Sequence, residues 1–206
     1  MQVVCLDLEG VLVPEIWIEF SQRTGIAEFA RTTRDEPDYD KLMRQRLALL
    51  ARHGLKLADI QRVIEGMGAL PGAREFLDEL RSRFQVFILS DTFYEFADPL
   101  MRQLARPTLL CHRLVVDAQG FVRGYRLRQV DQKRMAVNAL KGLNYQVIAA
   151  GDSFNDIGML EAAHAGFFIH APQPIVATYP QFPAMHNYAE LAAAIEQAGA
   201  RLQAAA

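Results

Sequence analysis

Apolar positions along the chain follow two patterns, short continuous runs and longer segments with helical spacing. The runs at 3–6, 85–90 and 146–150 are continuous rather than alternating, which is typical of strands buried on both faces of a sheet. Between them, apolar residues recur every three or four positions, as they do on one face of a helix. Strands separated by helices predict an α/β fold: a Rossmann-like, mostly parallel sheet with helices on both faces.

The same patterns predict where each element begins and ends. We expect strands at 3–6, 85–90, 108–116, 121–127, 146–150 and 166–170. We expect helices at about 14–25, 38–53, 57–64, 72–83, 98–105, 131–143 and 155–163, and a last one from about 187. Asp98 and Pro99 suit the start of the helix at 98, or that helix begins earlier and kinks at the proline.

The stretch from 15 to 70 differs from the rest of the chain, because it has helical spacing and no strand pattern. It is too long for a single crossover between two parallel strands. We therefore interpret 15–70 as a small helical cap domain inserted after the first strand. The segments 1–14 and 71–206 would together form the α/β core domain.

Composition is that of an ordinary globular protein. Hydrophobic residues make up 51% of the 206 positions and the formal net charge is −2, which gives no global field to attract nucleic acid or an anionic membrane. No apolar run approaches the roughly 18 residues of a membrane span. Cys5 and Cys111 are isolated, and the early acids Asp7, Glu9 and Glu15 do not fit a signal peptide. We expect a cytoplasmic protein with small-molecule partners.

Polar residues follow three of the apolar runs at the point where each run ends. These endings are Asp7-Leu8-Glu9, Ser90-Asp91 and Gly151-Asp152. In open parallel sheets, ligands bind beyond the carboxyl ends of the strands, where the strand order reverses. Side chains alternate along a strand, so Asp7 and Glu9 face the same way. The sequence therefore predicts one site at this edge of the sheet.

The residue types at these endings suit phosphoryl transfer. Asp7 would attack phosphorus and carry an aspartyl phosphate. Asp7 and Asp152 suit Mg²⁺, which offsets the repulsion between an anionic nucleophile and an anionic phosphate. Ser90 and Lys133 would hold the transferring oxygens. Glu9 would protonate the leaving alkoxide and then deprotonate the next acceptor.

Each of these residues also has an ordinary structural explanation. A serine at a strand end is usually a turn residue, and a lysine early in a helix, as at Lys133, is usually solvated. In GDSFND (151–156), Asp156 can serve a helix N-terminus, where a negative charge is favourable. Their joint occurrence in this order favours the catalytic interpretation.

In this order the motifs resemble those of the haloacid dehalogenase superfamily of phosphatases. The matching segments are DLEG (7–10), FILS (87–90), Lys133 and GDSFND (151–156). The resemblance implies that Asp7 is the nucleophile and Glu9 the proton donor and general base. It also implies Mg²⁺ on the Asp7 side chain, the main-chain carbonyl of Glu9 and Asp152. Most relatives have Asp where this chain has Glu9, so its carboxylate lies one methylene further out.

The long helical stretch after the first motif is similar to the cap of phosphoserine phosphatases. More narrowly, segments 7–15, 90–95 and 151–156 resemble the bifunctional phosphoserine phosphatase/phosphoserine–homoserine phosphotransferase family, which implies a place in serine and threonine biosynthesis. In that family an acid and an arginine of the cap recognise the amino acid. They correspond to Glu15 and Arg46.

The spacing around Arg46 supports a role inside the protein. Arg46 is four residues from both Leu42 and Leu50, so it lies on the apolar stripe of its helix and needs an anionic partner there. A substrate carboxylate is a good bidentate partner, and an internal ion pair with an acid of the cap is the alternative. The substrate contacts expected near the phosphate are Ser90, Asp91, Lys133 and Asn155.

We therefore expect a Mg²⁺-dependent phosphoserine phosphatase that also transfers the phosphoryl group to homoserine. One alternative is a related phosphatase for another small phosphomonoester. A receiver-type signalling domain also uses Asp, Ser or Thr, and Lys at strand ends. The helical stretch and the paired acid at position 9 argue against a receiver, because a switch needs neither a lid nor fast proton transfer.

Overall fold

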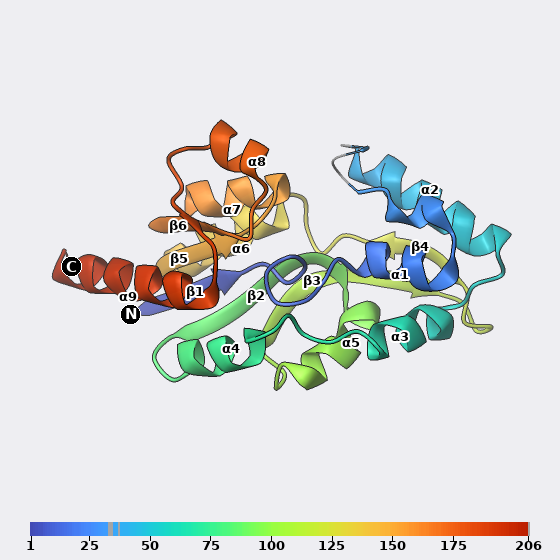
Figure 1. Cartoon of the computed structure of the whole chain (residues 1–206), viewed down its shortest axis with the longest axis horizontal. Coiled ribbons are helices and arrows are strands. Elements are labelled where there is room, and N and C mark those ends of the chain that lie inside the picture. Colours follow the sequence, from blue (N-terminus) through green and yellow to red (C-terminus); the bar gives the residue numbers. More distant parts are fainter. Residues whose placement is uncertain (33–34, 37, 206) are drawn as a thin grey trace.

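The computed structural model describes residues 1–32, 35–36 and 38–205, and within these residues a seven-stranded sheet forms the centre of the protein (Figure 1). The strand order is β4-β3-β2-β1-β5-β6-β7. All neighbouring strands are parallel except β3 and β4, which form an antiparallel hairpin. The strands are β1 (Gln2–Leu6), β2 (Gln85–Phe93), β3 (Thr108–Val116), β4 (Val122–Arg126), β5 (Gln146–Gly151), β6 (Ala165–Ile169) and β7 (Ala184–Met185). The predicted α/β sheet is confirmed.

Helices cover both faces of this sheet (Figure 1). One face carries α4 (Ala73–Arg81), α5 (Tyr94–Gln103) and α9 (Tyr188–Ala204). The other carries α6 (Gln132–Gly142), α7 (Ile157–Ala162) and α8 (Gln173–Thr178). Along β1, Val4 and Leu6 pack in the first core, and Val3 and Cys5 in the second. Because β1 is buried on both faces, its sequence is continuously apolar.

Residues 15–70, which we call the helical segment, gather at the carboxyl end of β1 (Figure 1). They form α1 (Ile16–Thr24), the 3-10 turn η1 (Ala27–Ala30), α2 (Tyr39–Arg52) and α3 (Leu57–Glu65), and the described residues of this segment contain no strand. Gly25 ends α1 in the left-handed region, and the Asp38 side chain caps α2 by accepting from the Lys41 N–H at 3.0 Å. The tip of the β3–β4 hairpin touches the segment, because the Leu57 N–H donates to the Gly120 carbonyl at 2.9 Å.

Helix α5 begins earlier than Asp98, which confirms the earlier-start alternative and rules out a start at the proline. It runs from Tyr94 to Gln103 with Pro99 in its interior. Proline has no N–H to donate to the carbonyl four residues back, which belongs to Glu95. That carbonyl instead accepts a hydrogen bond from the Gln61 side chain of α3 at 2.9 Å. A contact from a distant helix thus satisfies the group that the proline leaves open.

Three short elements differ from the sequence prediction. The strand expected at 166–170 is not the last, because β7 follows it. Helix α8 was not expected, and the helix expected at 155–163 is divided into the 3-10 turn η2 (Phe154–Asp156) and α7. A strand of two residues and helices of six are too short to produce a readable periodicity.

Two further observations concern the cysteines and the helix lengths. Cys5 and Cys111 are both buried free thiols, and burial raises the pKa of Cys5 to about 12, so it is protonated at neutral pH. In the part of the chain that the structure describes, no helix has the length and apolar character needed to span a membrane.

Candidate active site

The candidate site lies where β1, β2 and β5 end, which is also where the strand order reverses. Strand β1 pairs with β2 on one side and β5 on the other, and Asp7 directly follows it. The Asp7 N–H donates to the Ala150 carbonyl of β5 at 3.1 Å, which fixes the strand end. The helical segment closes a cavity of about 90 Å³ over these ends. Its lining residues are Asp7, Glu9, Glu15, Trp17, Thr32, Tyr39, Arg46, Ser90, Asp91, Thr92, Ser153 and Asn155.

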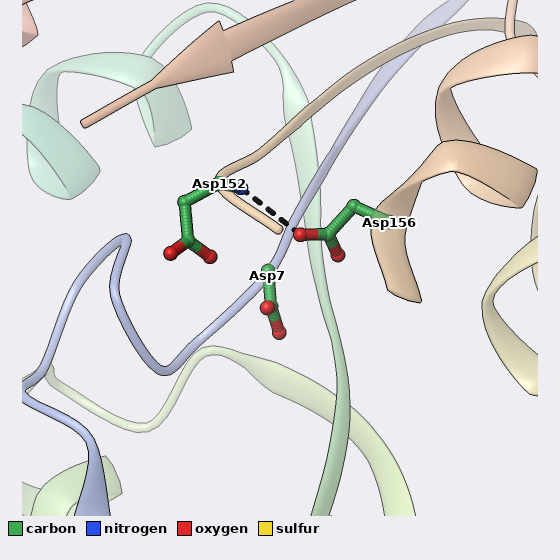
Figure 2. A group of neighbouring side chains, drawn as sticks. All are labelled: Asp7, Asp152 and Asp156. Atoms are coloured by element: carbon green, nitrogen blue, oxygen red, sulfur yellow. Dashed lines mark hydrogen bonds between the residues drawn. The ribbon is translucent and has the colours of Figure 1, made fainter. Parts of the chain in front are cut away.

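Three buried carboxylates meet at the bottom of the site. Figure 2 shows the side chains of Asp7, Asp152 and Asp156 close together, and each offers an oxygen within 4.8 Å of the others. Gly10 approaches Asp152 so closely that a Cβ at position 10 would overlap its carboxylate, and its backbone has a φ of 76°. The glycine after the first motif is therefore required both by the turn and by the neighbouring acid.

Asp156 also organises the loop that carries Asp152. One oxygen of Asp156 accepts from the N–H groups of Asp152 and Ser153, at 2.9 and 3.0 Å (Figure 2 shows the first bond). Its other oxygen accepts from the Lys133 ammonium at 2.7 Å. Asp156 thus caps a short helical turn, as the structural explanation expected, and also pairs with a lysine of the site.

Lys133 is in direct contact with Asp7, the candidate nucleophile. Its ammonium is 3.0 Å from Asp7 Oδ1 and 2.7 Å from Asp156 Oδ1, and the lysine is 2% exposed. Burial alone would lower its pKa, but the charges of Asp156 and Asp7 raise it well above the usual value. The neighbouring carboxylates therefore favour the charged form of Lys133, and this buried lysine is not the solvated residue that its helical position also allowed.

The cluster still has more negative than positive charge. Burial, followed by the charge of Asp156, raises the pKa of Asp7 well above its usual range, while Lys133 lowers it. Three carboxylates face one ammonium, so ionised Asp7 needs further positive charge nearby. Closely spaced carboxylate oxygens are the ligands that Mg²⁺ prefers, and the oxygens of Asp7 and Asp152 fit such an ion. Asp156 lies beside them with both oxygens already accepting hydrogen bonds.

Glu9 reaches across the site to the first turn of α1. Its carboxylate accepts from the Ile16 N–H at 3.0 Å, a donor that a helix N-terminus leaves unpaired. Burial, and then the charge of Glu15, raises the pKa of Glu9 to about 7, while the Ile16 N–H, Arg46 and the Thr92 side chain lower it. This contact links the acid of the first motif to the helical segment.

Arg46 of α2 lines the same cavity as Asp7 and contacts other residues of the helical segment. It is 8% exposed, its Nη2 donates to the Arg31 carbonyl at 2.9 Å, and its guanidinium lies 4.5 Å from the centre of the Trp17 ring. Its buried Nε has no hydrogen-bond partner among the described residues. Burial lowers the pKa of Arg46 to about 10, partly offset by Glu9, so the group remains charged at neutral pH.

Asp91, which also lines the cavity, forms the centre of a hydrogen-bond network. It accepts from the side chains of Gln132 at 3.0 Å and Asn155 at 2.9 Å, and His112 Nε2 is 3.5 Å away. Burial would raise its pKa, but the Lys133 charge and these hydrogen bonds lower it below the usual range. The network fixes Asn155 beside the cavity and keeps Asp91 ionised.

The structure brings the predicted residues together. All of them line the cavity except Lys133 and Asp152, and these two lie next to Asp7. Arg46 is buried and lies next to Trp17, and among the described residues it forms no ion pair with an acid of the helical segment. Ser90 is 2% exposed, and its hydroxyl accepts from the Thr92 N–H at 3.3 Å.

Sequence reasoning missed several residues of the site. Asp156 was within the quoted GDSFND segment but was assigned to the helix dipole, because its pairing with Lys133 depends on the fold. Trp17 and Tyr39 line the cavity as ordinary amphipathic helix residues, with no local signal. Thr92 directly follows Asp91 and Gln132 directly precedes Lys133, so their position next to predicted site residues was the only sequence feature that could have indicated them.

Comparison with known proteins gives one family for most of the chain. The family model described as haloacid dehalogenase-like hydrolase matches residues 1–164. Phosphoserine phosphatase ThrH of Pseudomonas aeruginosa is 62% identical over 191 residues, covering 93% of this chain and 93% of that protein. A phosphoserine phosphatase of Pseudomonas syringae is 61% identical and covers 93% of this chain and 81% of that protein.

Solved structures give the same fold. A phosphoserine phosphatase from T. onnurineus aligns with a TM-score of 0.73 and 25% identity, over 92% of each chain. A substrate-bound phosphoserine phosphatase complex aligns with a TM-score of 0.76 and 18% identity, over 95% of this chain and 97% of that one. The match at 18% identity supports the architecture alone.

Proposed function

The chain belongs to the haloacid dehalogenase-like hydrolases, and we propose that it is a Mg²⁺-dependent phosphoserine phosphatase acting through an aspartyl phosphate on Asp7. We further propose that it transfers the phosphoryl group of phosphoserine to homoserine. The observation that carries the proposal is that Asp7 and the buried Arg46 line the same small cavity.

The two ends of this cavity suit the two ends of phosphoserine. At the phosphate end, Ser90 and Asn155 offer polar groups near Asp7, and Lys133 supplies positive charge. At the amino-acid end, Arg46 is a buried cation whose free Nε suits a carboxylate, and Glu15 suits an ammonium. The relatives at 62% and 61% identity are named phosphoserine phosphatases, which supports serine as the amino acid.

In the first half-reaction an Asp7 oxygen forms a bond to phosphorus while the bond from phosphorus to the serine oxygen breaks. Glu9 gives its proton to that leaving oxygen. A pKa of about 7 suits this role, because an acid near neutrality is present in both protonation states. Lys133 holds Asp7 in place and offsets part of its negative charge.

In the second half-reaction a hydroxyl group attacks the phosphorus of the aspartyl phosphate. Glu9 takes the proton from that hydroxyl, and the Asp7 carboxylate leaves. Water as the acceptor yields phosphate, whereas homoserine yields phosphohomoserine. Homoserine differs from serine by one methylene, so Arg46 and Glu15 suit both amino acids.

Asp7, Asp152 and the main-chain carbonyl of Glu9 are the groups that we propose hold Mg²⁺, with Asp156 beside them. When bound there, Mg²⁺ supplies the positive charge that the carboxylate cluster lacks and lowers the repulsion between Asp7 and a phosphate. Asp156 keeps the Asp152 loop closed through two backbone N–H groups.

We propose that residues 15–70 act as a cap domain over a core made of 1–14 and 71–206. The support is that the segment supplies Glu15, Trp17, Tyr39 and Arg46 to the cavity. A cap of this kind excludes bulk water during transfer. Serine and threonine biosynthesis, in the cytoplasm, is the setting that fits these substrates.

The test measures phosphate and phosphohomoserine formed from L-phosphoserine, with and without homoserine. We expect phosphate alone without homoserine, and both products with it, in each case only when Mg²⁺ is present. EDTA should abolish both products, and added Mg²⁺ should restore them.

Phosphoethanolamine and a phosphosugar serve as comparison substrates. A phosphosugar turned over as fast as phosphoserine would indicate a phosphatase for another small phosphomonoester. Activity that EDTA leaves unchanged would contradict the Mg²⁺ site.

A further inference from the structure

We propose that Trp17 is a positioning residue that sets the orientation of Arg46 and thereby selects substrates with a carboxylate. This inference rests on the proposed function, because it concerns the amino-acid end of the same cavity. Trp17 is the only tryptophan in the sequence, and it lies in the first turn of α1, directly after Ile16, which contacts Glu9.

The indole of Trp17 is held on several sides by other aromatic rings. It stacks on Phe29 at 5.6 Å and meets Phe20 edge-to-face at 6.0 Å, both within the helical segment. It also meets Phe96 of α5 at 5.5 Å, and α5 packs on the sheet. Trp17 is 7% exposed. Its ring is therefore fixed both to the helical segment and to the core.

The Arg46 guanidinium lies 4.5 Å from the centre of the Trp17 ring. A second contact, from Nη2 to the Arg31 carbonyl at 2.9 Å, fixes the rotation of the guanidinium on that surface. Together the two contacts restrain a long side chain that otherwise has many rotamers. The buried Nε is left without a hydrogen-bond partner among the described residues, in a side chain that lines the cavity.

An aromatic ring is suited to this position for a physical reason. A buried guanidinium loses its hydration, and an aromatic face recovers part of that loss by cation–π attraction, most strongly for tryptophan. The ring stabilises the charge without using any of the N–H groups. An acid in the same place would pair with Arg46 and compete with the substrate carboxylate. Trp17 thus stabilises the charge of Arg46, restrains its side chain and leaves its N–H groups available to a substrate carboxylate.

The geometry predicts a selective effect on substrates. Phosphoserine has a carboxylate, whereas phosphoethanolamine has the same phosphate and ammonium groups without it. We expect Trp17→Leu to raise KM for phosphoserine by about fivefold to tenfold, as expected for loss of a desolvated cation–π contact. KM for phosphoethanolamine should stay within about twofold, and Trp17→Phe should recover most of the loss because it keeps an aromatic face.

Phe20→Leu is the matched control. Phe20 packs in the same aromatic cluster, whereas the guanidinium lies over Trp17. A phosphoserine-specific rise in Trp17→Leu but not in Phe20→Leu supports the proposal. Equal rises on both substrates, or the same selective rise in Phe20→Leu, would overturn it, because Trp17 would then act only in packing.

Fluorescence tests the contact without any turnover. Since Trp17 is the only tryptophan, emission reports on this ring alone. We expect Arg46→Met to change the emission of the ligand-free protein, and Arg31→Met, which keeps the Arg31 carbonyl, to leave it unchanged. Unchanged emission in Arg46→Met would overturn the stacking whatever the substrate is. A wild type that shows this stacking but does not hydrolyse phosphoserine would instead contradict the proposed function.

Discussion

The two ends of the cavity are built in different ways. The end that we propose binds phosphate consists of Asp7, Asp152 and Lys133, which lie at strand ends or early in a helix of the core, and Lys133 pairs directly with Asp7 and Asp156. The amino-acid end consists of Glu15 and Arg46, which come from helices of the segment 15–70, with Arg46 resting on an aromatic ring. At the first end the Lys133 ammonium pairs with a carboxylate, whereas at the second the Arg46 guanidinium lies over the Trp17 ring.

This difference is consistent with the group that each end would bind under the proposed function. The phosphate end has an excess of carboxylates, so it suits a cation as well as a phosphate. The amino-acid end keeps one cation without a charged partner at hydrogen-bond distance among the described residues, so it suits an anionic group. Changes at the phosphate end should therefore stop the chemistry, and changes at the other end should alter the choice of substrate.

The largest expected effect comes from Asp7→Asn. The amide keeps the volume but loses the nucleophile, so turnover should fall by about a thousandfold or more. It also removes one of three clustered negative charges, so the melting temperature should not fall. Phosphate release and a thermal melt on the same sample measure both. A folded variant with substantial activity would remove Asp7 from the nucleophile role.

Lys133→Ala tests the charge balance of the same end. The variant leaves buried carboxylates without their ammonium, and we expect unfolding free energy in EDTA to fall by about 3–5 kcal/mol. Lys141→Ala is the control, since Lys141 lies on the same helix but is exposed, and its loss should cost less than about 1 kcal/mol. Urea titrations of both variants give the comparison. Equal losses would mean that the carboxylates do not depend on Lys133.

The two ends also differ in how much of them the sequence could predict. Asp7 and Asp152 belong to short motifs at the ends of β1 and β5, which are neighbours in the sheet, and Lys133 lies early in α6. Arg46 was assigned from the family resemblance, and its place on an apolar stripe supported that assignment. Trp17 was not found, because its contact with Arg46 joins two helices through tertiary packing that no local pattern records.

Helix α5 also shows a feature of the fold that depends on a contact between two helices and that local sequence patterns do not record. Its place in the sequence was predicted, but Asp98 and Pro99 suited a helix start equally well. In the structure Pro99 lies inside the helix, and Gln61 of α3 donates to the Glu95 carbonyl, for which Pro99 has no N–H. The spacing of residues within one segment does not reveal this contact with another helix.

At the amino-acid end, Arg46→Ala should change selectivity more than catalysis. We expect the variant to lose about 1.5–3 kcal/mol of phosphoserine binding, as for a hydrogen bond to a charged group. Phosphoethanolamine should be affected much less, because it has no carboxylate. Steady-state KM values for both substrates provide the measurement. A similar loss on both would show that Arg46 supports packing of the helical segment instead.

The smallest expected effect is that of Glu9→Asp, which should change how the phosphoryl group is divided between water and homoserine. Glu9 accepts from the Ile16 N–H of α1 at 3.0 Å, and we expect an aspartate, whose side chain is one methylene shorter, to lose that contact. We expect the shorter acid to favour water over homoserine, so the ratio of phosphate to phosphohomoserine should rise. Product analysis at fixed homoserine compares the two proteins. An unchanged or lower ratio would mean that the glutamate does not tune acceptor choice.

Exchange of labelled serine into phosphoserine tests both ends in one measurement. It requires a phosphorylated Asp7 and a pocket that holds an amino acid while that intermediate exists. We predict that the wild type incorporates label from free serine into unlabelled phosphoserine. Asp7→Asn should show neither exchange nor phosphate release, and Arg46→Ala should lose exchange more than phosphate release. Phosphate release by the wild type with no exchange at saturating serine would contradict a cavity that joins the two ends.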